Sequence, residues 1–348
     1  MSISTSNAMS RIYWSESNIP DIQGKHFVVT GGNSGLGLET VRALATRGAI
    51  VTLACRDLAK GNAARESIAK NFGSVQIDVQ ELDLASLSSI KNFAANLSSK
   101  PIDVLINNAG IMAPPKSHTS DGFELQLGTN HLGHFALTAQ LWPALMKSAS
   151  PRVVTVSSNA HKMSQMKLGQ MHWDDLMSDK KYSAWGAYAQ SKLANLLFAF
   201  ELQRRATAAG KTNFKSLAAH PGYSATNLSS SVAPSAPSIF RKLTKNIEGV
   251  MGQEARMGAL PQLYAATETD IPGGAYVGPD GFGEWRGYPK LVNANEHAKN
   301  LETYFVSVVY IDLGYLALQL VPAGGTVPFT RYSTARLSRH LMPLNSCA

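Results

Sequence analysis

Cysteine is scarce in this sequence. Its 348 residues include only Cys55 and Cys347, which lie far apart and belong to no CxxC pair. Disulfide frameworks and zinc sites need several cysteines or histidines at fixed spacings, so we expect neither a disulfide scaffold nor a bound metal. A chain that uses so little cysteine is typical of a reducing compartment, and we predict a cytoplasmic location.

A leader segment and a block of charge are missing as well. Residues 1–21 are mostly polar and contain no apolar stretch of the kind that a secretory signal needs, so we expect the mature chain to begin at Met1. Lysine and arginine outnumber aspartate and glutamate by 32 to 24, a formal net charge of +8, but no run of five or six basic residues occurs. We therefore expect no nucleic-acid partner. We interpret the basic residues as solvated surface, with a few that serve an anionic cofactor.

Short apolar runs alternate with segments of helical composition. Strands are predicted over residues 25–30, 49–55, 74–84, 101–106, 152–158 and 215–220, with a short last strand within 273–279. Helices are predicted over residues 38–45, 87–97 and 123–141, the last of them stopped near Pro143. This alternation predicts an α/β fold: a doubly wound parallel sheet of the Rossmann type, in a single domain, with its ligand at the carboxyl ends of the strands.

A glycine-rich turn follows the first predicted strand. It reads Gly31-Gly32-Asn33-Ser34-Gly35-Leu36-Gly37 and leads into a helical segment. Glycines let the backbone turn tightly and approach a pyrophosphate, and the start of a helix presents unpaired N–H groups to it. The spacing TGxxxGxG differs from the common GxGxxG fingerprint, and glycine-rich turns also occur in ordinary loops.

The second predicted strand ends in Arg56 and Asp57. At this point of a dinucleotide-binding unit an acidic residue binds the adenine ribose, whereas an arginine suits the 2′-phosphate of NADP(H). Arg56 therefore favours NADP(H) over NAD(H). Two alternatives stay open: Arg56 is an ordinary surface residue beside a helix, and Asp57 binds the ribose, pairs with Arg56 or caps the next helix.

Tyr188 and Lys192 form a candidate proton-transfer pair. They are four positions apart in a segment of helical composition, so they share one helix face. A nearby cation favours the phenolate, and we expect Lys192 to lower the pKa of Tyr188. A tyrosine and a lysine at this spacing also occur by chance on many solvated helices.

Asn130 lies among apolar residues of the predicted helix 123–141. An unpaired buried amide costs about 1–3 kcal/mol, so Asn130 needs partners. We interpret His131 and His134 on the same helix as packed or hydrogen-bonded residues, because no acidic residue or cysteine lies at metal-ligand spacing.

Two segments are candidates for the substrate side of the site. The stretch between Ser158 and Tyr188 either walls an apolar pocket or packs locally, and its large apolar residues are Met163, Met166, Met171, Trp173 and Trp185. Residues 229–238 are small, polar and interrupted by proline, which is typical of a loop and favours a lid over the site.

Six motifs occur in order along the chain: TGGNSGLG, NNAG, TNHLGHF, VVTVSS, YAQSK and HPGYSAT. Together they resemble the short-chain dehydrogenase/reductase family. Longer strings, such as LINNAGIMA and SKLANLLFAFELQ, are most similar to its retinol-dehydrogenase-like and protochlorophyllide-reductase-like branch. The resemblance covers roughly residues 14–302. We divide the chain into an N-terminal extension (1–23), a catalytic domain (24–302) and a divergent C-terminal tail (303–348).

The resemblance implies a role for each matching residue. The catalytic tetrad would be Asn130, Ser158, Tyr188 and Lys192, with Ser157 as a minor alternative to Ser158. Asn130 would order a water that links Lys192 to solvent. The residues that would bind the cofactor are Gly31, Ser34, Gly35, Leu36 and Gly37 at the pyrophosphate, Arg56 at the 2′-phosphate, Asp83 and Leu84 at the adenine, Asn107, Ala109 and Gly110 at the ribose, and Pro221, Gly222 and Thr226 at the nicotinamide, with Tyr188 and Lys192 beside it.

The function implied is an NADP(H)-dependent oxidoreductase that acts on a carbonyl or alcohol of a small, mostly apolar substrate. The alternative from another class is a non-catalytic dinucleotide sensor on the same fold. A photoreductase would need a catalytic cysteine pattern that Cys55, at the adenine end, does not supply. Which substrate is used, which reaction direction prevails and whether the chain forms a homo-oligomer stay open at this point.

The tail departs from the branch after Glu302. Residues 304–321 are apolar, but Asp312 interrupts them, and a charge in mid-segment costs about 2.5–3.5 kcal/mol in a bilayer. We rank three interpretations in descending order: a variant terminus that packs loosely, an appended core or partner-binding segment, and a membrane-surface anchor.

Overall fold

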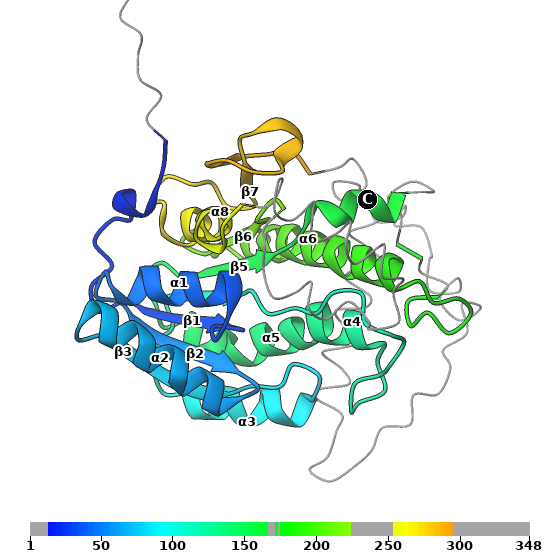
Figure 1. Ribbon diagram of the computed structural model, residues 1–348, viewed down its shortest axis with the longest axis horizontal. Coiled ribbons are helices and arrows are strands. Elements are labelled where there is room, and N and C mark those ends of the chain that lie inside the picture. The colour runs from blue at the N-terminus through cyan, green and yellow to red at the C-terminus, as the bar shows by residue number, and fades with distance from the viewer. Residues whose placement is uncertain (1–12, 166–170, 173–174, 224–252, 295–348) are drawn as a thin grey trace, which may run out of the picture.

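A parallel sheet forms the centre of the protein, with helices on both of its faces (Figure 1). The computed structural model describes residues 13–165, 171–172, 175–223 and 253–294. Within these residues the sheet has eight strands: β1 (His26–Thr30), β2 (Ile50–Cys55), β3 (Gln76–Glu81), β4 (Val104–Asn107), β5 (Arg152–Val156), β6 (Lys215–Ala219), β7 (Tyr276–Pro279) and β8 (Pro289–Leu291).

The strand order is β3-β2-β1-β4-β5-β6-β7-β8. Strands β1 to β7 pair in parallel, and β8 pairs antiparallel with β7. The chain reverses its direction across the sheet between β1 and β4, and such a switch point opens a crevice at the carboxyl ends of the strands. The predicted fold class, a doubly wound parallel sheet, is confirmed.

The helices form two layers, and the central strands are buried between them. Every residue of β1, β4, β5 and β7 is buried, as expected for parallel strands that are covered on both faces. Phe27 and Val29 of β1 belong to one core cluster, and the intervening Val28 belongs to another. The first cluster includes residues of α1 (Gly35–Ala45), α2 (Leu58–Phe72) and α8 (Ala255–Thr267), the second those of α3 (Leu87–Leu97) and α5 (Gly133–Leu145), and a third centres on α6 (Ala184–Ala208).

The predicted helix 123–141 differs from the structure in two ways. It is divided into a short α4 (Leu125–Leu127), a π-helical turn η2 (Gly128–Leu132) and α5. The prediction that it stops near Pro143 is wrong, because Pro143 lies inside α5, which continues to Leu145. Ala144 and Leu145 are buried in the α3–α5 cluster, and this packing outweighs the hydrogen bond that proline removes.

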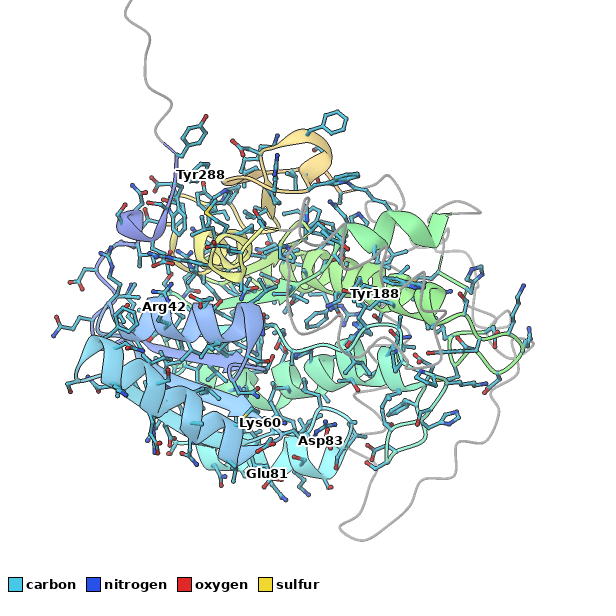
Figure 2. The ribbon with its side chains drawn as sticks, viewed as in Figure 1. Arg42, Lys60, Glu81, Asp83, Tyr188 and Tyr288 are labelled. Atoms are coloured by element: carbon cyan, nitrogen blue, oxygen red, sulfur yellow. The ribbon has the colours of Figure 1, made fainter. Side chains whose placement is uncertain are left out.

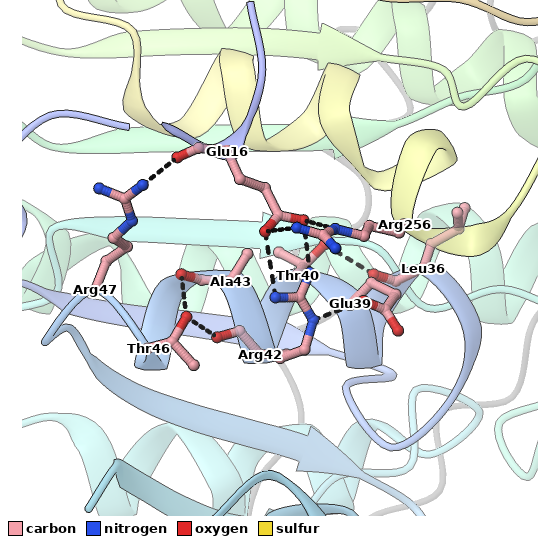
Figure 3. A network of polar contacts seen from close by, with 9 residues as sticks. All are labelled: Glu16, Leu36, Glu39, Thr40, Arg42, Ala43, Thr46, Arg47 and Arg256. Carbon is pink, nitrogen blue, oxygen red and sulfur yellow. Dashed lines mark hydrogen bonds and ion pairs between the residues drawn. The ribbon is translucent and has the colours of Figure 1, made fainter. Parts of the chain in front are cut away.

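Residues 13–23 pack on the sheet and its helices. Ile19 and Ile22 are buried in the same cluster as α1 and α8. Glu16, in the short 3-10 turn η1 (Glu16–Asn18), pairs with Arg42 of α1 and with Arg256 of α8, at 2.9 Å from the latter (Figure 3). One carboxylate thus joins three segments that are far apart in the sequence, so the folded unit includes residues that the sequence placed in the extension.

Several predictions concern residues outside the described ranges. These are Thr226, the loop 229–238, the tail 303–348, and the side chains of Met163, Met166 and Trp173. Among the helices that the structure describes, none is both long enough and apolar enough to cross a membrane.

Candidate active site

The predicted site residues lie where the parallel strands end. Each of six strands contributes one group, at or just beyond its last residue: Gly31 after β1, Arg56 after β2, Asp83 after β3, Asn107 at the end of β4, Ser158 after β5 and Pro221 after β6. Figure 2 places Asp83 and Tyr188 on the side of the molecule to which the arrows of β1 to β3 point. The carboxyl edge of the sheet, where the switch point lies, therefore gathers most of the predicted residues.

The glycine turn has a shape that favours glycine at several positions, of which Gly31 and Gly37 are the most constrained. Gly31 has a φ of +67°, and a Cβ there would lie 3.0 Å from the Ala109 Cα. A Cβ at Gly37 would overlap the carbonyl oxygen of Gly31. Helix α1 begins at Gly35, and the hydroxyl of its N-cap residue Ser34 makes no capping bond to it. The turn therefore brings bare backbone up to a helix start, and this cradle fits the pyrophosphate of a dinucleotide.

A polar network behind this turn was missed by the sequence interpretation. The hydroxyl of Thr30 accepts hydrogen bonds from the backbone N–H groups of Asn108 and Ala109, both at 2.9 Å. The Asn108 side-chain amide donates to the Thr30 carbonyl at 2.7 Å, and its oxygen accepts from Gln262 of α8 at 3.2 Å. The network fixes the end of β1 against the end of β4. The signal for this network in the sequence is the second asparagine of the NNAG motif. The prediction used Asn107 and omitted Asn108.

At the adenine end the structure separates the roles of Arg56 and Asp57. Asp57 is the N-cap of α2: its carboxylate accepts from the Lys60 backbone N–H at 3.0 Å and pairs with the Lys60 ammonium at 3.2 Å. Of the alternatives for Asp57, the helix cap is confirmed, no ion pair with Arg56 is present, and ribose binding stays a prediction. Arg56 is exposed and has no hydrogen bond or ion pair to any other described residue. Its guanidinium is thus accessible to an anion.

Asp83, Leu84 and Asn107 are held by the fold itself. The Asp83 carboxylate accepts from the backbone N–H of Ala85 at 2.9 Å, and Leu84 is buried in the α3–α5 cluster. The Asn107 side chain is fully buried and donates to the Thr138 hydroxyl at 3.1 Å. It therefore points into the core, and Asn107 offers the crevice its backbone only.

Tyr188 and Lys192 lie in the first half of α6, whose N-cap is Ser183. Both side chains are buried, with 6% and 4% exposure. The Ser158 hydroxyl lies near enough to the phenol of Tyr188 to lower its pKa. The Ser157 hydroxyl donates instead to the Lys192 carbonyl at 2.7 Å, so of the two serines Ser158 is the one that acts on the phenol.

Burial dominates the proton affinities of this pair. It raises the pKa of Tyr188 to about 12, although the nearby Ser158 hydroxyl acts in the opposite direction. It lowers the pKa of Lys192 to about 8. The Lys192 ammonium donates to the Val156 carbonyl at 3.1 Å and lies 5.8 Å from the Tyr188 ring centre. The expectation that Lys192 lowers the pKa of Tyr188 is therefore wrong for this arrangement, because loss of solvation outweighs attraction at this distance.

Asn130 ties the loop after β4 to α6. Its side-chain oxygen accepts from the Ile111 N–H at 2.8 Å, and its amide donates to the Ile111 carbonyl and to the Ser191 hydroxyl. The Ser191 hydroxyl donates in turn to the Tyr188 carbonyl at 2.7 Å. A Cβ at Gly110 would lie 3.2 Å from the Asn130 oxygen and 3.4 Å from the Lys192 ammonium. The π-helical turn thus places Asn130 beside Gly110 and Lys192. Both polar atoms of the Asn130 side chain are hydrogen-bonded in this position.

The histidines of this helix are hydrogen-bonded, as predicted. His131 contacts the Asn195 side chain at 3.3 Å, and His134 contacts the Asn130 carbonyl and the Thr30 hydroxyl. Burial lowers the pKa of His131 to about 4 and that of His134 to about 3, so both rings are neutral near pH 7. In the part of the chain that the structure describes, no three His, Cys, Asp or Glu residues lie close enough together to hold a metal ion.

Trp185 lies beside the phenol, and Gly222 turns the chain after β6. Trp185 is 41% exposed, and its ring packs edge-on against Tyr188 with centres 6.1 Å apart, whereas Met171 is buried in the α6 cluster. Local packing, one of the two predicted outcomes, is thus confirmed for Met171, and an apolar pocket walled by this excursion stays a prediction. After β6, Gly222 has a φ of +68°, and a Cβ there would overlap the Trp285 carbonyl.

A cavity of about 530 Å³ lies elsewhere, between α6, β7 and β8, and its lining includes Phe200 and Val292. Phe200 is twelve residues beyond Tyr188, about 18 Å along the helix axis. This cavity is therefore not the one into which Tyr188 would act.

Known proteins share both the sequence pattern and the fold. The profile of the short-chain dehydrogenases matches residues 25–169. Human retinol dehydrogenase 13 is 38% identical over 252 residues, covering 72% of this chain and 74% of that protein. The chain belongs to the short-chain dehydrogenase/reductase family. It lies in the retinol-dehydrogenase-like branch, as the motifs predicted.

Two further relatives of this short-chain dehydrogenase/reductase define how far the likeness extends. Human retinol dehydrogenase 11 is 47% identical over 203 residues, which are 58% of this chain and 61% of that protein. The chain thus spans about three-fifths of the length of this relative. A crystal structure of an uncharacterised protein from Mycobacterium paratuberculosis superposes with a TM-score of 0.70 at 44% identity, covering 87% of this chain and 97% of the other.

Proposed function

We propose that the protein is an NADP(H)-dependent oxidoreductase that converts between a carbonyl and an alcohol on a mostly apolar substrate. The observation that carries the proposal is the buried pair of the Tyr188 phenol and the Lys192 ammonium, with Ser158 close to the phenol, at the strand ends that also hold the glycine cradle. A non-catalytic dinucleotide sensor would need the cradle but not this triad of Ser158, Tyr188 and Lys192. The names of the retinol dehydrogenases agree with an apolar alcohol as substrate.

The residues suit proton transfer coupled to hydride transfer. Bound NADPH supplies the hydride. Ser158 donates a hydrogen bond to the substrate oxygen, and Tyr188, with a pKa of about 12, keeps its proton at neutral pH until an alkoxide forms that can take it. Lys192 stabilises the phenolate that remains, because a buried cation acts strongly where little water screens it. Asn130 holds the turn beside Gly110 and Lys192 in place.

The rate of carbonyl reduction is expected to fall above about pH 8. The pKa of Lys192 lies near 8, so the ammonium is charged below this pH and loses its proton above it. Since Tyr188 stays protonated to about pH 12, the loss of the lysine charge should determine the alkaline limb. We expect kcat/KM for carbonyl reduction to fall about tenfold per pH unit above the apparent pKa. A pH–rate profile from pH 6 to 10 checks this, and a constant kcat/KM across that range would contradict the role of Lys192.

Arg56 is expected to set the preference for NADPH. Its guanidinium is exposed and without a partner among the described residues, whereas Asp57 is occupied by Lys60. Replacing Arg56 with alanine should raise the KM for NADPH about tenfold, as expected for one charge-assisted hydrogen bond, and leave the KM for NADH unchanged. Lys70→Ala, at the far end of α2, is the matched control for removal of a positive charge. If the unaltered protein prefers NADH, the assignment fails.

The substrate class is tested with the purified full chain. NADPH absorbance is followed against a panel of aldehydes, ketones and alcohols that range from polar to extended apolar compounds. We expect turnover with the apolar members, in agreement with the exposed Trp185 ring beside Tyr188. Absence of turnover across the panel, with NADPH binding intact, would favour the sensor. The cytoplasmic location and a homo-oligomeric state remain predictions from the sequence.

A further inference from the structure

His134 is hydrogen-bonded to two parts of the site, in addition to the contacts that the loop after β4 makes with both. It lies on α5, one turn after Asn130, and is 1% exposed. Its Nδ1 is 2.9 Å from the Asn130 carbonyl oxygen, and its Nε2 is 2.9 Å from the Thr30 hydroxyl. Thr30 precedes the glycine cradle and is 104 residues away in the sequence.

The chemistry of these contacts assigns the proton on each atom. A carbonyl oxygen only accepts, so Nδ1 of His134 carries a hydrogen and donates to Asn130. Because burial lowers the pKa of His134 to about 3, the ring is neutral and Nε2 is an acceptor. The Thr30 hydroxyl therefore donates to Nε2 at 2.9 Å, in preference to the Ile106 carbonyl at 3.4 Å.

This orientation leaves the oxygen of Thr30 free to accept from the backbone. Two N–H groups point at it, those of Asn108 and Ala109, each at 2.9 Å. A hydroxyl has one proton to give and two lone pairs, so all of its capacity is used. The network runs without a break from the carbonyl of Asn130, through His134 and Thr30, to the loop that packs against Gly31.

We propose that His134 is a positioning residue that fixes the Asn130 turn relative to the glycine cradle, so that the tetrad and the cofactor keep one geometry. The proposal rests on the proposed function, because it assigns His134 a part in that same site. His134 contacts neither substrate nor cofactor in this assignment. Its effect passes through Asn130 on one side and through Thr30 on the other.

The two hydrogen bonds are separable by substitution. In His134→Phe the ring keeps its approximate size and loses both bonds. In His134→Asn an amide nitrogen takes the place of Nδ1 and keeps the bond to the Asn130 carbonyl, while the bond to Thr30 is lost. Thr30→Val removes the hydroxyl from the other end. The matched control is His131→Phe, a neighbouring imidazole that contacts Asn195 instead of the cradle.

The experiment measures the Kd for NADPH by fluorescence titration, kcat with the best carbonyl substrate, and the Tm of each variant. For His134→Phe we expect Kd to rise about tenfold and kcat to fall about tenfold, the effect of losing one or two buried hydrogen bonds. For His134→Asn we expect kcat to return to within about twofold of the unaltered protein while Kd stays raised. His131→Phe should leave Kd unchanged.

The double variant Thr30→Val/His134→Phe tests whether the two residues act along one path. If they do, it binds NADPH about as weakly as Thr30→Val alone, because the second change removes nothing further. If the increases in Kd of the two single variants multiply in the double variant, the proposal is overturned. It is also overturned if His134→Phe lowers the Tm but leaves Kd and kcat unchanged. If His134→Phe does not fold, His134→Asn and Thr30→Val decide, and equal losses of kcat in both would also overturn it.

Failure of the proposed function gives a different result. If the unaltered protein binds NADPH but reduces no carbonyl compound, the Kd values of the His134 and Thr30 variants can still be compared. That comparison then supports or overturns the link between His134 and Thr30. An unaltered protein that does not bind NADPH overturns both proposals at once.

Discussion

Replacing Tyr188 with phenylalanine is expected to lower kcat by about 10²- to 10⁴-fold, the usual contribution of a general acid. The substitution removes one oxygen and leaves the ring, which packs edge-on against Trp185. Ser158 can still hold the substrate oxygen, but no group with a proton lies in the place of the phenol. Because Tyr188 is buried in the wall of the site and not in the glycine cradle, the Kd for NADPH should change less than about twofold.

Tyr182→Phe is the matched control for this experiment. Tyr182 precedes α6, and its hydroxyl donates to the Pro114 carbonyl at 2.6 Å. Its loss removes a tyrosine hydroxyl that is outside the triad, so kcat should stay within a few-fold of the unaltered value. Stopped-flow or steady-state NADPH absorbance measures kcat, and fluorescence titration measures Kd. Unchanged turnover in Tyr188→Phe would refute the proton-transfer role.

Gly37→Ala is expected to weaken NADPH binding by at least about 100-fold. A Cβ at this position would overlap the carbonyl oxygen of Gly31 and also approach the Asn108 amide at 2.6 Å. The first of these is backbone and the second holds Thr30, so neither can move without opening the cradle. Binding of the pyrophosphate by backbone N–H groups depends on this close approach. Gly37→Ala should therefore change the Kd for NADPH more than it changes the Tm of the protein.

The control for Gly37→Ala is another glycine at the same position of a helix. Gly186 is the third residue of α6, as Gly37 is the third residue of α1. A Cβ there would lie 3.2 Å from the Ser183 side chain, which can shift slightly. Gly186→Ala should bind NADPH with an unchanged Kd. If Gly37→Ala binds NADPH as tightly as Gly186→Ala does, the turn does not form the phosphate site.

The sheet could be predicted because its signals are local. Buried parallel strands read as continuous apolar runs, and β1, β4 and β5 each end beside a residue with polar or glycine character. The carboxyl ends of parallel strands meet at one edge, so the order of strands and motifs along the chain was enough to place Gly31, Arg56 and Ser158 together.

What could not be predicted depends on packing between distant residues. The pKa of Tyr188 rises because neighbouring elements exclude water from it, and the spacing to Lys192 contains no information about burial. The inward orientation of Asn107 depends on Thr138 of α5. The π-helical turn at Asn130 and the continuation of α5 through Pro143 likewise follow from contacts that no sequence window includes.

The ion pairs of Glu16 determine where the folding unit begins. A chain started at Gly24 would keep every nucleotide-binding motif, yet it would leave the guanidinium groups of Arg42 and Arg256 side by side without their shared counter-ion, and it would uncover the apolar surface that Ile19 and Ile22 protect. Boundaries drawn from the motifs alone would therefore yield an aggregation-prone fragment, and any recombinant version should include the segment that holds Glu16, Ile19 and Ile22.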